Sequence, residues 1–464
     1  MSASPSPPAD RGLPADVLDE LRRIVGESHV VTDRDRCASF ERDWTGRFVG
    51  TTPAVVRPGS AAEVEAVVAL ARRHRRALVP QGGNTGLVGG SVPLAGEVVV
   101  STTRLDTLGA IDELTGQVTV GAGVTLATVQ DEAAAAGLRY AVDLGARDRA
   151  TVGGTVATNA GGVHVLRHGP TRAQLAGIQA VLGTGALVSH LGGLTKDNTG
   201  YDLAQLLCGS EGTLGIVTAV RLRLIPAPAS TVTALVGFGS VARAVDAVAQ
   251  LVRTVPELEV AELLLDDGLD LVCTTIGLPP PLPARYPAYV VLEAAGRRDP
   301  SAALAAAVLD LVDDEAVAVA IEPGRRADLW RYREEHTPVI NTIGPPHKLD
   351  VTLPLPALAA FIGDVPGVVR TVDPGARTWL FGHVGDGNVH VSVTGVDPGD
   401  EGVDDAVLRL VAERGGSISA EHGIGTAKRP WLGLARSAAE LDAFRAIKAA
   451  LDPDGIMNPN VLVG

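Results

Sequence analysis

The chain has 464 residues and a formal net charge of −14 at pH 7, with 46% hydrophobic, 20% charged and only 3% aromatic residues. This length exceeds what one hydrophobic core normally serves, so we expect two or more domains built mainly on Ala, Val and Leu. The acidic charge argues against nucleic acid or an anionic membrane surface as a main partner.

Cysteine usage and the first residues bear on the cellular compartment. Three widely spaced cysteines without a Cys-x-x-Cys pair predict neither a disulfide framework nor a cysteine metal site, which suits a reducing cytoplasm. Residues 1–14 lack a basic segment followed by an apolar one, and we interpret them as a flexible tail and not as a signal peptide. No run approaches the ~18 apolar residues of a membrane-spanning helix. We therefore expect a cytoplasmic protein without a transmembrane segment.

The first half of the chain alternates between strand and helix patterns. We expect helices at 13–26, 60–73 and 126–136, and strands at 54–58, 77–79, 98–101, 117–120, 177–188 and 214–224. The second of these helices begins with a Ser60 cap and has Glu63 three residues later, the pattern of a capping box. Pro226-Ala-Pro228 interrupts the alternation, and we place the first domain boundary there.

Three glycine-rich stretches lie in this first half, at 82–90, 153–162 and 209–215. The first follows a strand pattern but precedes no obvious helix, so it is not the dinucleotide fingerprint. Residues without a Cβ let backbone N–H groups approach and line a phosphate. One such stretch alone is more commonly a tight turn. Three of them, each with small polar residues, favour a large ligand whose pyrophosphate is held mostly by backbone.

The second half predicts helices packed on a sheet, an α+β arrangement. Helices are expected at 240–252, 302–311, 327–335, 356–362 and 437–451, and strands at 289–293, 316–321, 349–353 and within 379–393.

A hairpin signal, Asp386-Gly387, lies between His383 and His390. On one uninterrupted strand these histidines would lie on opposite faces, whereas a reversal at the signal puts them on adjacent strands, where they can converge. They can equally be two polar residues that flank a turn. With Glu421 they form two imidazoles and a carboxylate, a common ligand set for a divalent transition metal, provided that a cofactor is present for the metal to serve.

Several of these motifs together resemble a known family. The segments 80–86, 144–146, 153–162, 196–202 and 209–216 resemble the FAD domain of the vanillyl-alcohol-oxidase (PCMH-type) superfamily. The later segments 382–390, 420–425 and 451–459 resemble the FAD-linked D-2-hydroxyacid dehydrogenases. That group includes D-lactate dehydrogenase, the glycolate oxidase flavin subunit and D-2-hydroxyglutarate dehydrogenase. The match runs from about residue 50 to the end of the chain, and its motifs are long and ordered.

The resemblance implies an α+β fold. It would comprise a tail (1–14), a PCMH-type FAD-binding domain of two subdomains (15–226), a substrate domain with a helix-covered antiparallel sheet (227–425), and a helical segment that returns to the flavin (426–464). We expect non-covalent FAD, because the first glycine stretch has no His or Cys. His164 and His168 leave covalent attachment open.

The resemblance also implies which residues bind FAD. Residues 80–91 would hold the pyrophosphate, while 143–162 and 209–216 would surround the rest of the cofactor. The FAD-binding residues predicted in this way are Pro80, Gln81, Gly82, Gly83, Asn84, Thr85, Gly86, Leu87, Gly90, Ser91, Leu144, Gly145, Ala146, Thr151, Gly153, Gly154, Ala157, Thr158, Asn159, Gly161, Gly162, Glu211, Gly212, Gly215, Ile216 and Asn458.

In the family pattern His383, His390 and Glu421 match ligands of a divalent metal, and His422 matches the catalytic base. Zinc is favoured, and Mn²⁺ or Fe²⁺ would also suit these ligands. A Lewis acid on the substrate hydroxyl and C1 carboxylate would acidify the alcohol while the C2 hydride moves to flavin N5. An imidazole titrates near neutral pH, as this base should. Because neighbours on a strand point apart, Glu421 and His422 are expected in a loop.

Substrate recognition is expected at Arg333, Thr337 and Lys348, which match the set that binds a substrate carboxylate in the 2-hydroxyglutarate branch. Arg333 and Thr337 have the spacing of one helix face, and Lys348 opens the next strand. Two cations in one pocket favour a dicarboxylate, so we predict oxidation of D-2-hydroxyglutarate to 2-oxoglutarate. Ser392 stands where this branch usually has Asn, and its shorter hydroxyl implies a water-mediated C1 contact or a different substrate.

The alternatives are D-lactate dehydrogenase or glycolate oxidase flavin subunit activity, a flavin subunit inactive outside a larger complex, and a metal-binding protein without flavin. The retained metal and base residues speak against an inactive subunit. Expected partners are a small 2-hydroxy acid and an electron acceptor such as oxygen, an electron-transfer flavoprotein, a quinone or a cytochrome, and a homodimer is compatible with the sequence. We expect His336 and His347 on the solvated surface.

Overall fold

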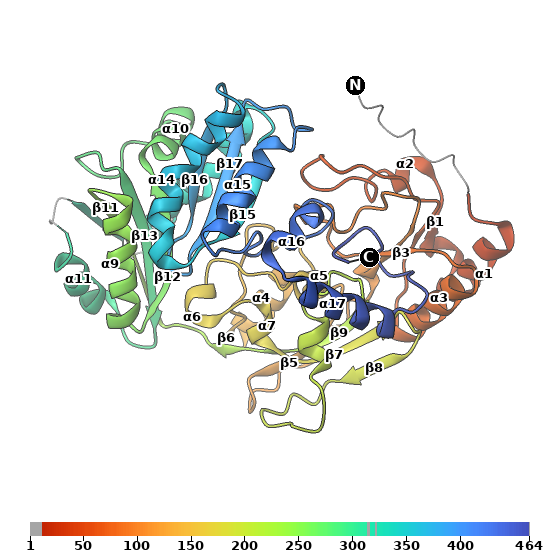
Figure 1. Cartoon of the computed structure of the whole chain (residues 1–464). Coiled ribbons are helices and arrows are strands. Elements are labelled where there is room, and N and C mark those ends of the chain that lie inside the picture. The colour runs from red at the N-terminus through yellow and green to blue at the C-terminus, as the bar shows by residue number, and fades with distance from the viewer. Residues whose placement is uncertain (1–11, 313–315, 321–322, 464) are drawn as a thin grey trace. The chain divides into compact units, whose positions relative to one another are not determined.

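The computed structural model describes residues 12–312, 316–320 and 323–463 (Figure 1). Most of the predicted tail and Ile321, the last residue of a predicted strand, lie outside these described residues. The chain forms two compact units. Unit 1 contains residues 1–161, 170–226 and 422–464, and unit 2 contains residues 162–169 and 227–421.

Unit 1 begins with a four-stranded sheet in the order β1-β2-β4-β3. Its strands are β1 (Val30–Val31), β2 (Val55–Val56), β3 (Leu78–Gln81) and β4 (Val98–Ser101), and its helices are α1 (Ala15–Val25), α2 (Arg34–Cys37) and α3 (Ala61–Arg73). The predicted start of α3 is confirmed, because the Ser60 side chain accepts from the Glu63 N–H. Only the β1–β2 pair is antiparallel, so this is a mixed sheet.

The second sheet of unit 1 is antiparallel, in the order β5-β9-β7-β8. Its strands are β5 (Gln117–Gly121), β7 (Leu175–Leu182), β8 (Leu187–His190) and β9 (Gly215–Arg223). The prediction of one strand over 177–188 is wrong, because the chain reverses through a turn in which Gly185 has φ 86°. The apolar pattern continues through that turn and hides it. One hydrophobic core serves both sheets.

The rest of unit 1 consists of short elements and the end of the chain. These are α4 (Leu126–Ala135), β6 (Leu138–Arg139), α5 (Val152–Thr158), α7 (Thr171–Gln174), α8 (Leu203–Leu207), β10 (Ile225–Pro226), α16 (Leu432–Ala435), α17 (Ala438–Leu451) and the 3-10 turns η1 (Glu27–His29), η2 (Thr102–Arg104) and η4 (Arg429–Trp431). The buried Lys448 on α17 donates to the Thr213 carbonyl at 2.8 Å and pairs with Asp452. This contact joins the C-terminal helix to the rest of unit 1.

Unit 2 is built on a seven-stranded antiparallel sheet in the order β14-β11-β13-β12-β16-β17-β15. The strands are β11 (Ser230–Phe238), β12 (Leu258–Leu265), β13 (Ala288–Gly296), β14 (Val317–Ala320), β15 (His347–Thr352), β16 (Arg377–His383) and β17 (Asn388–Thr394). The predicted α+β class with a helix-covered antiparallel sheet is therefore confirmed.

Helices cover the sheet of unit 2, and α9 and α14 lie side by side against it (Figure 1). The helices are α6 (Val165–His168), α9 (Val241–Thr254), α10 (Asp266–Ile276), α11 (Ser301–Leu309), α12 (Pro323–Glu334), α13 (His336–Ile343), α14 (Leu355–Val372) and α15 (Gly402–Glu413). A second core cluster packs Leu269, Tyr332 and Ile340 from α10, α12 and α13 on the sheet. These three helices cover the face that carries the candidate site.

Two expectations for unit 2 need correction. The sequence analysis did not predict β11, β12, α10 or α15, although the buried Val403, Val407 and Val411 of α15 have helical spacing. The helix predicted at 356–362 extends to Val372, because it tolerates Pro366 in its interior. With 18 residues, α14 is long and apolar enough to span a membrane by length and composition alone, contrary to our expectation. In unit 2 it packs against α9, α15 and β16.

Candidate active site

The strand register gathers polar side chains on one face of the sheet of unit 2. His390 on β17 lies directly opposite Asp350 on β15 and Phe381 on β16. One step along, Ser392 lies opposite Lys348 and Trp379. At the other end His383 pairs with Glu262 on β12. Cross-strand partners share a face of the sheet. The polar side chains among them form one row, which we call the polar row: Glu262, His383, Asp350, His390, Lys348 and Ser392.

The predicted hairpin is confirmed. Strands β16 and β17 are joined at residues 384–387, where Gly387 has φ 83° and the Asp386 carboxylate accepts from the Asn388 N–H at 3.1 Å. The reversal puts the rings of His383 and His390 5.3 Å apart between centroids, at 75° to each other. The two imidazoles therefore converge, as the spacing around Asp386-Gly387 predicted.

His383 lies between two carboxylates. Its Nδ1 pairs with the buried Glu262, and its Nε2 is 3.7 Å from Oε1 of Glu421. Burial lowers the pKa of His383, but the charges of Glu262 and Glu421 outweigh burial and hold this pKa well above its ordinary value. The pair with Glu262 fixes the ring so that Nε2 is the nitrogen nearer Glu421.

His390 has a different electrostatic environment. Its Nδ1 is 3.5 Å from Oδ1 of Asp350. Burial, together with the positive charges of His383 and Arg333, lowers the pKa of His390 to about 3, against the opposing effect of Asp350. The ring is therefore neutral at pH 7, the form in which an imidazole binds a metal.

Asp350 is a site residue that sequence reasoning missed. It is completely buried, and its Oδ1 accepts from Asn388 Nδ2 at 2.8 Å. Its Oδ2 accepts from the backbone N–H groups of Glu421 at 2.8 Å and Ala420 at 3.2 Å. Ligand-type atoms of Asp350, His390 and Glu421 lie within 4.8 Å of one another. Because both its oxygens already accept hydrogen bonds, Asp350 is better suited to orient the other two than to bind a metal itself.

Glu421 lies in the loop that was predicted for it, outside any helix or strand. Its Oε2 accepts from the Gly162 N–H at 2.9 Å. Gly162 was predicted to contact FAD, but it belongs to unit 2 with Glu421. The next residue, His422, is also outside regular structure and is where unit 1 resumes. For Asp350, the sequence signal was its alternation with apolar residues and with Lys348, which places both side chains on one face of the strand.

The predicted substrate residues lie on the same face or on the helices that cover it. Arg333, on α12, donates from Nε to Oε2 of Glu262 at 2.5 Å, and its guanidinium lies 4.8 Å above the Phe381 ring. Thr337 is on α13, a separate helix, so the prediction that one helix carries both residues is wrong. Lys348 and Ser392 are direct cross-strand partners, and burial lowers the pKa of Lys348.

The prediction that His336 and His347 are solvated is wrong. Both side chains are buried, with 1% and 2% exposure. His347 Nδ1 is 3.1 Å from Oδ1 of Asp404, and Nε2 is 3.0 Å from the Asp397 carbonyl. His336 packs against Phe381, with 5.1 Å between ring centroids. Within the described part of the chain neither ring nitrogen of His336 makes a well-formed hydrogen bond.

The residues predicted to bind FAD belong to unit 1, apart from Gly162. The structure gives two of the glycines a packing role. A Cβ on Gly83 would lie 1.8 Å from the Arg149 carbonyl oxygen, and one on Gly82 would lie 2.2 Å from Oγ1 of Thr151. The first glycine-rich stretch therefore packs directly on residues 149–151, which immediately precede the second stretch. The second is not a plain loop, because Thr151 caps α5 by accepting from the Gly154 N–H.

The third stretch meets the end of the chain within unit 1. Asn458 donates from Nδ2 to the carbonyls of Gly90 at 2.8 Å and Glu211 at 2.7 Å. The Glu211 carboxylate accepts from the N–H groups of Ile424 and Gly425. Burial raises the pKa of Glu211, against the opposing effect of these bonds. Asn458 Oδ1 is buried without a hydrogen-bond partner among the described residues, so an acceptor is available here for a ligand donor.

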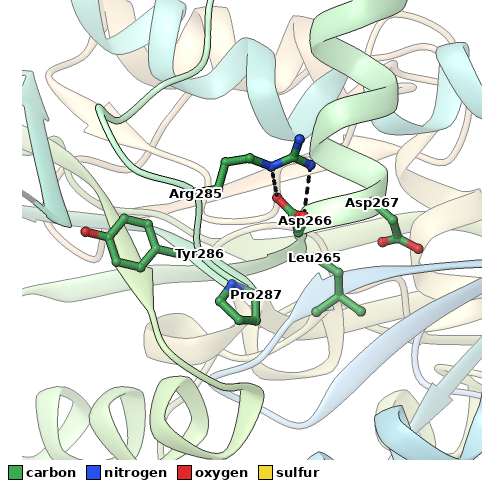
Figure 2. Close-up of a pocket in the computed structure, with 6 residues that line it drawn as sticks. All are labelled: Leu265, Asp266, Asp267, Arg285, Tyr286 and Pro287. Carbon is green, nitrogen blue, oxygen red and sulfur yellow. Dashed lines mark hydrogen bonds and ion pairs between the residues drawn. The ribbon is translucent and has the colours of Figure 1, made fainter.

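An open pocket of about 410 Å³ also exists in unit 2, where β12 ends and α10 begins (Figure 2). Two of its charged groups pair with each other, because Arg285 forms a two-pronged ion pair with Asp266, while Asp267 is a further carboxylate of the lining (Figure 2). Tyr286, Pro287 and Leu265 form much of the remaining wall. The pocket contains no histidine and none of the predicted site residues, so we assign the chemistry to the polar row and not to this pocket.

Comparisons with known proteins identify the family to which the chain belongs. Residues 52–190 match the family described as FAD binding domain, and residues 227–462 match the family of FAD linked oxidases, C-terminal domain. The chain is 37% identical over 457 residues to D-2-hydroxyglutarate dehydrogenase of Xanthomonas citri pv. viticola, an alignment that covers 95% of this chain and 96% of that protein. It is 34% identical over 458 residues to D-2-hydroxyglutarate dehydrogenase of Stutzerimonas stutzeri, covering 96% and 98% of the two chains.

Among solved structures, p-cresol methylhydroxylase with substrate bound matches with a TM-score of 0.77 at 16% identity, covering 96% of both chains. Fold and comparisons together define an FAD-linked oxidase whose FAD-binding domain precedes a C-terminal oxidase domain. The chain belongs to the FAD-linked D-2-hydroxyacid dehydrogenase family of the vanillyl-alcohol-oxidase (PCMH-type) superfamily. It is an FAD-dependent dehydrogenase that oxidises a D-2-hydroxy acid, and the predicted family and fold are confirmed.

Proposed function

We propose that the protein oxidises D-2-hydroxyglutarate to 2-oxoglutarate with FAD and a divalent metal. The observation that carries this proposal is the polar row of unit 2, where two converging imidazoles share a sheet face with the cation Lys348. The Glu421 carboxylate lies 3.7 Å from His383 Nε2, and Arg333 lies above Phe381 on the same face. A dicarboxylate with a hydroxyl at C2 can present its hydroxyl and C1 carboxylate to the imidazoles and its distal carboxylate to the two cations. The curated relatives named D-2-hydroxyglutarate dehydrogenase support the same substrate.

The residues present fit a metal at His383, His390 and Glu421. Each histidine approaches a buried carboxylate through Nδ1, Glu262 for His383 and Asp350 for His390. This arrangement orients a ligand imidazole and directs Nε2 to a metal. Two imidazoles and a carboxylate with an open position suit a Lewis acid, with zinc favoured and Mn²⁺ or Fe²⁺ compatible.

The residues of unit 1 likewise fit FAD, bound without a covalent link. Gly86 and Gly145 have no atom within 4 Å of where a Cβ would be, so their backbone faces open space that a ligand can enter. The unpartnered Asn458 Oδ1 can accept a hydrogen bond from the cofactor. His168, one of the two residues that left covalent attachment open, has its Nε2 3.0 Å from Oε1 of Glu259 within unit 2.

When bound, the flavin supplies a hydride acceptor at N5 and the metal supplies a Lewis acid for the hydroxyl and C1 carboxylate. His422, next in the chain to the ligand Glu421, takes the hydroxyl proton as general base. Arg333, Thr337 and Lys348 bind the distal carboxylate and so orient C2 for hydride loss. The buried Ser392 hydroxyl contributes one hydrogen bond on the C1 side.

Oxidation of D-lactate or glycolate is the second candidate, and one observation favours it. Ser392 replaces the longer Asn of the 2-hydroxyglutarate branch, and it is the direct partner of Lys348 across β15 and β17.

With either substrate, an electron-transfer flavoprotein, a quinone or a cytochrome would serve as the electron acceptor.

Anaerobic bleaching of the flavin tests both candidates. We expect D-2-hydroxyglutarate to reduce the flavin faster than D-lactate or glycolate, the L-acid to be inert, and a chelator to abolish reduction until Zn²⁺ is restored. Faster reduction by D-lactate would overturn the substrate. Reduction that is insensitive to the chelator would overturn the role of the metal.

A further inference from the structure

We infer that Glu262 couples the substrate-binding Arg333 to the metal-binding His383, so that each of the two subsites senses the state of the other. The inference rests on the proposed function, because it takes its two ends from the proposed metal and substrate sites. Glu262 lies on β12 and is completely buried. One of its oxygens pairs with His383 Nδ1 and the other accepts from Arg333 Nε.

The coupling follows from the shape of a carboxylate. Its two oxygens are held rigidly in one plane, so a rotation that improves the contact with Arg333 also moves the oxygen that orients His383. Burial strengthens this constraint, because a buried anion is costly unless both oxygens keep their partners. Arg333 comes from α12 and His383 from the end of β16, so the carboxylate is a direct physical link between two separate elements.

Arg333 is left able to bind a second carboxylate. It uses only Nε for Glu262, and its two terminal nitrogens form no hydrogen bond or ion pair with the residues that the structure describes. Phe381 supports the guanidinium from below at 4.8 Å and precedes His383 by two positions on the same face of β16. The fork of Arg333 is therefore held by Glu262 and Phe381 while its outer donors remain for a ligand.

A second carboxylate provides a matched comparison within the same sheet face. Glu293, on the neighbouring strand β13, is also buried and accepts from Arg326 Nη2 at 2.8 Å and Trp330 Nε1 at 2.9 Å. Both donors are on α12, as Arg333 is. Glu293 therefore helps to dock the same helix on the sheet, and its hydrogen-bond partners among the described residues include no histidine. Replacing Glu293 reproduces the loss of a buried carboxylate under α12 without touching the metal site.

The test compares Glu262→Gln and Glu293→Gln in the FAD-loaded full chain. Zn²⁺ affinity is measured by competition with a chromophoric chelator, and binding of the inert dicarboxylate glutarate is measured by calorimetry on the metal-free protein. We expect Glu262→Gln to weaken Zn²⁺ roughly 10–100-fold and to weaken glutarate as well. Glu293→Gln should leave Zn²⁺ affinity within about twofold, because it lies outside the metal's supporting contacts. Equal weakening of Zn²⁺ by both variants would overturn the inference.

A double-mutant cycle isolates the coupling itself. In the absence of any substrate, Arg333→Ala should raise Zn²⁺ affinity by roughly fivefold or more, because Glu262 then acts on His383 alone. In the Glu262→Gln background this gain should disappear. An identical gain in both backgrounds would reduce the effect to simple charge repulsion and would overturn the role of Glu262.

The conservative variant Glu262→Asp guards against misfolding. It keeps the charge but is one methylene shorter and cannot span both partners, so it should fold and still lose the dependence of Zn²⁺ affinity on Arg333. Failure of D-2-hydroxyglutarate to bleach the flavin, with the Zn²⁺ cycle as expected, would overturn the proposed substrate and leave the coupling. The converse result would leave the function and remove the coupling.

Discussion

The two units of this dehydrogenase build their sites from different materials. In unit 1 the predicted FAD site consists mainly of backbone, brought together by glycines at which a Cβ would collide with a neighbouring strand or loop. In unit 2 the candidate site consists of side chains on one sheet face and on the segments next to it, and two buried carboxylates hold several of them: Glu262 contacts His383 and Arg333, and Asp350 contacts His390. Unit 1 should therefore be sensitive to added atoms, and unit 2 to the removal of charge or of a hydrogen-bond acceptor.

The largest effect is expected from removing a metal ligand in unit 2. His390→Ala should lower kcat/KM by about 10³-fold, because a Lewis acid contributes several kcal/mol to this chemistry. The same variant should lose bound Zn²⁺ but keep its FAD spectrum, since the cofactor is assigned to unit 1. Metal content by mass spectrometry and steady-state rates measure the two effects.

His190→Ala is the matched control, because the side chain of that histidine is 62% exposed and pairs with Asp197 on the surface of unit 1. It should change neither rate nor metal content. Loss of FAD together with metal in His390→Ala would contradict the separation of the two sites.

The next effect tests unit 1 by adding a single methyl group. Gly83→Ala would put its Cβ 1.8 Å from the Arg149 carbonyl oxygen, a clash that the backbone cannot relieve without moving the first glycine-rich stretch away from residues 149–151. We expect a loss of about 1–3 kcal/mol in the free energy of unfolding and a protein that purifies with substoichiometric FAD. Flavin content and denaturant unfolding are the measurements.

Gly192→Ala is the control, because a Cβ there would meet nothing within 4 Å. It should unfold with the wild-type midpoint. Full FAD occupancy in Gly83→Ala would show that the close packing of Gly83 on Arg149 does not shape the cofactor site.

A smaller effect is expected from replacing Asp350, which orients the proposed metal ligands. Asp350→Asn keeps the shape of the side chain but replaces one acceptor oxygen with a donor, so it cannot accept from Asn388 and from the Glu421 backbone at once. Zn²⁺ affinity should fall roughly 10–100-fold, as for other supports of ligand side chains.

The control for Asp350→Asn is Asp404→Asn, which alters an equally buried Asp–His pair, with His347, away from the polar row. It should lower stability without changing Zn²⁺ affinity. If both variants weaken Zn²⁺ alike, Asp350 has no specific role in orienting the ligands.

The same comparison explains what the sequence could and could not predict. The glycine-rich stretches and the histidine hairpin were visible because glycine and histidine are unusual in such patterns, and Asp386-Gly387 gave the correct reversal. The supports were not visible. Asp350 reads as an ordinary polar residue of a predicted strand, and Glu262 lies where no strand was predicted. Only the strand register reveals that they face His390 and His383. The strand β12 itself was missed, because a fully buried antiparallel strand lacks the alternation that marks a half-exposed one.

His336 is a buried histidine of unit 2 whose ring nitrogens make no well-formed hydrogen bond with the described residues, and it offers the mildest test. Burial, with Arg333 nearby, lowers its pKa to about 3 in the folded protein, against about 6.5 when unfolded. The unfolded chain therefore binds a proton below pH 6.5 that the folded protein does not, so stability falls as the pH falls from 6.5 toward 3. His336→Leu removes this penalty and an imidazole without well-formed hydrogen bonds.

We expect His336→Leu to raise the free energy of unfolding by about 1 kcal/mol at pH 7.5 and by about 1.4 kcal/mol more at pH 5.5, one pH unit below the unfolded pKa. His347→Leu should lower the free energy of unfolding, because its ring nitrogens lie within hydrogen-bonding distance of Asp404 and of the Asp397 carbonyl. Denaturant unfolding at the two pH values measures both. A destabilised His336→Leu would contradict this prediction, because it would mean that the imidazole makes stabilising polar contacts in the folded protein.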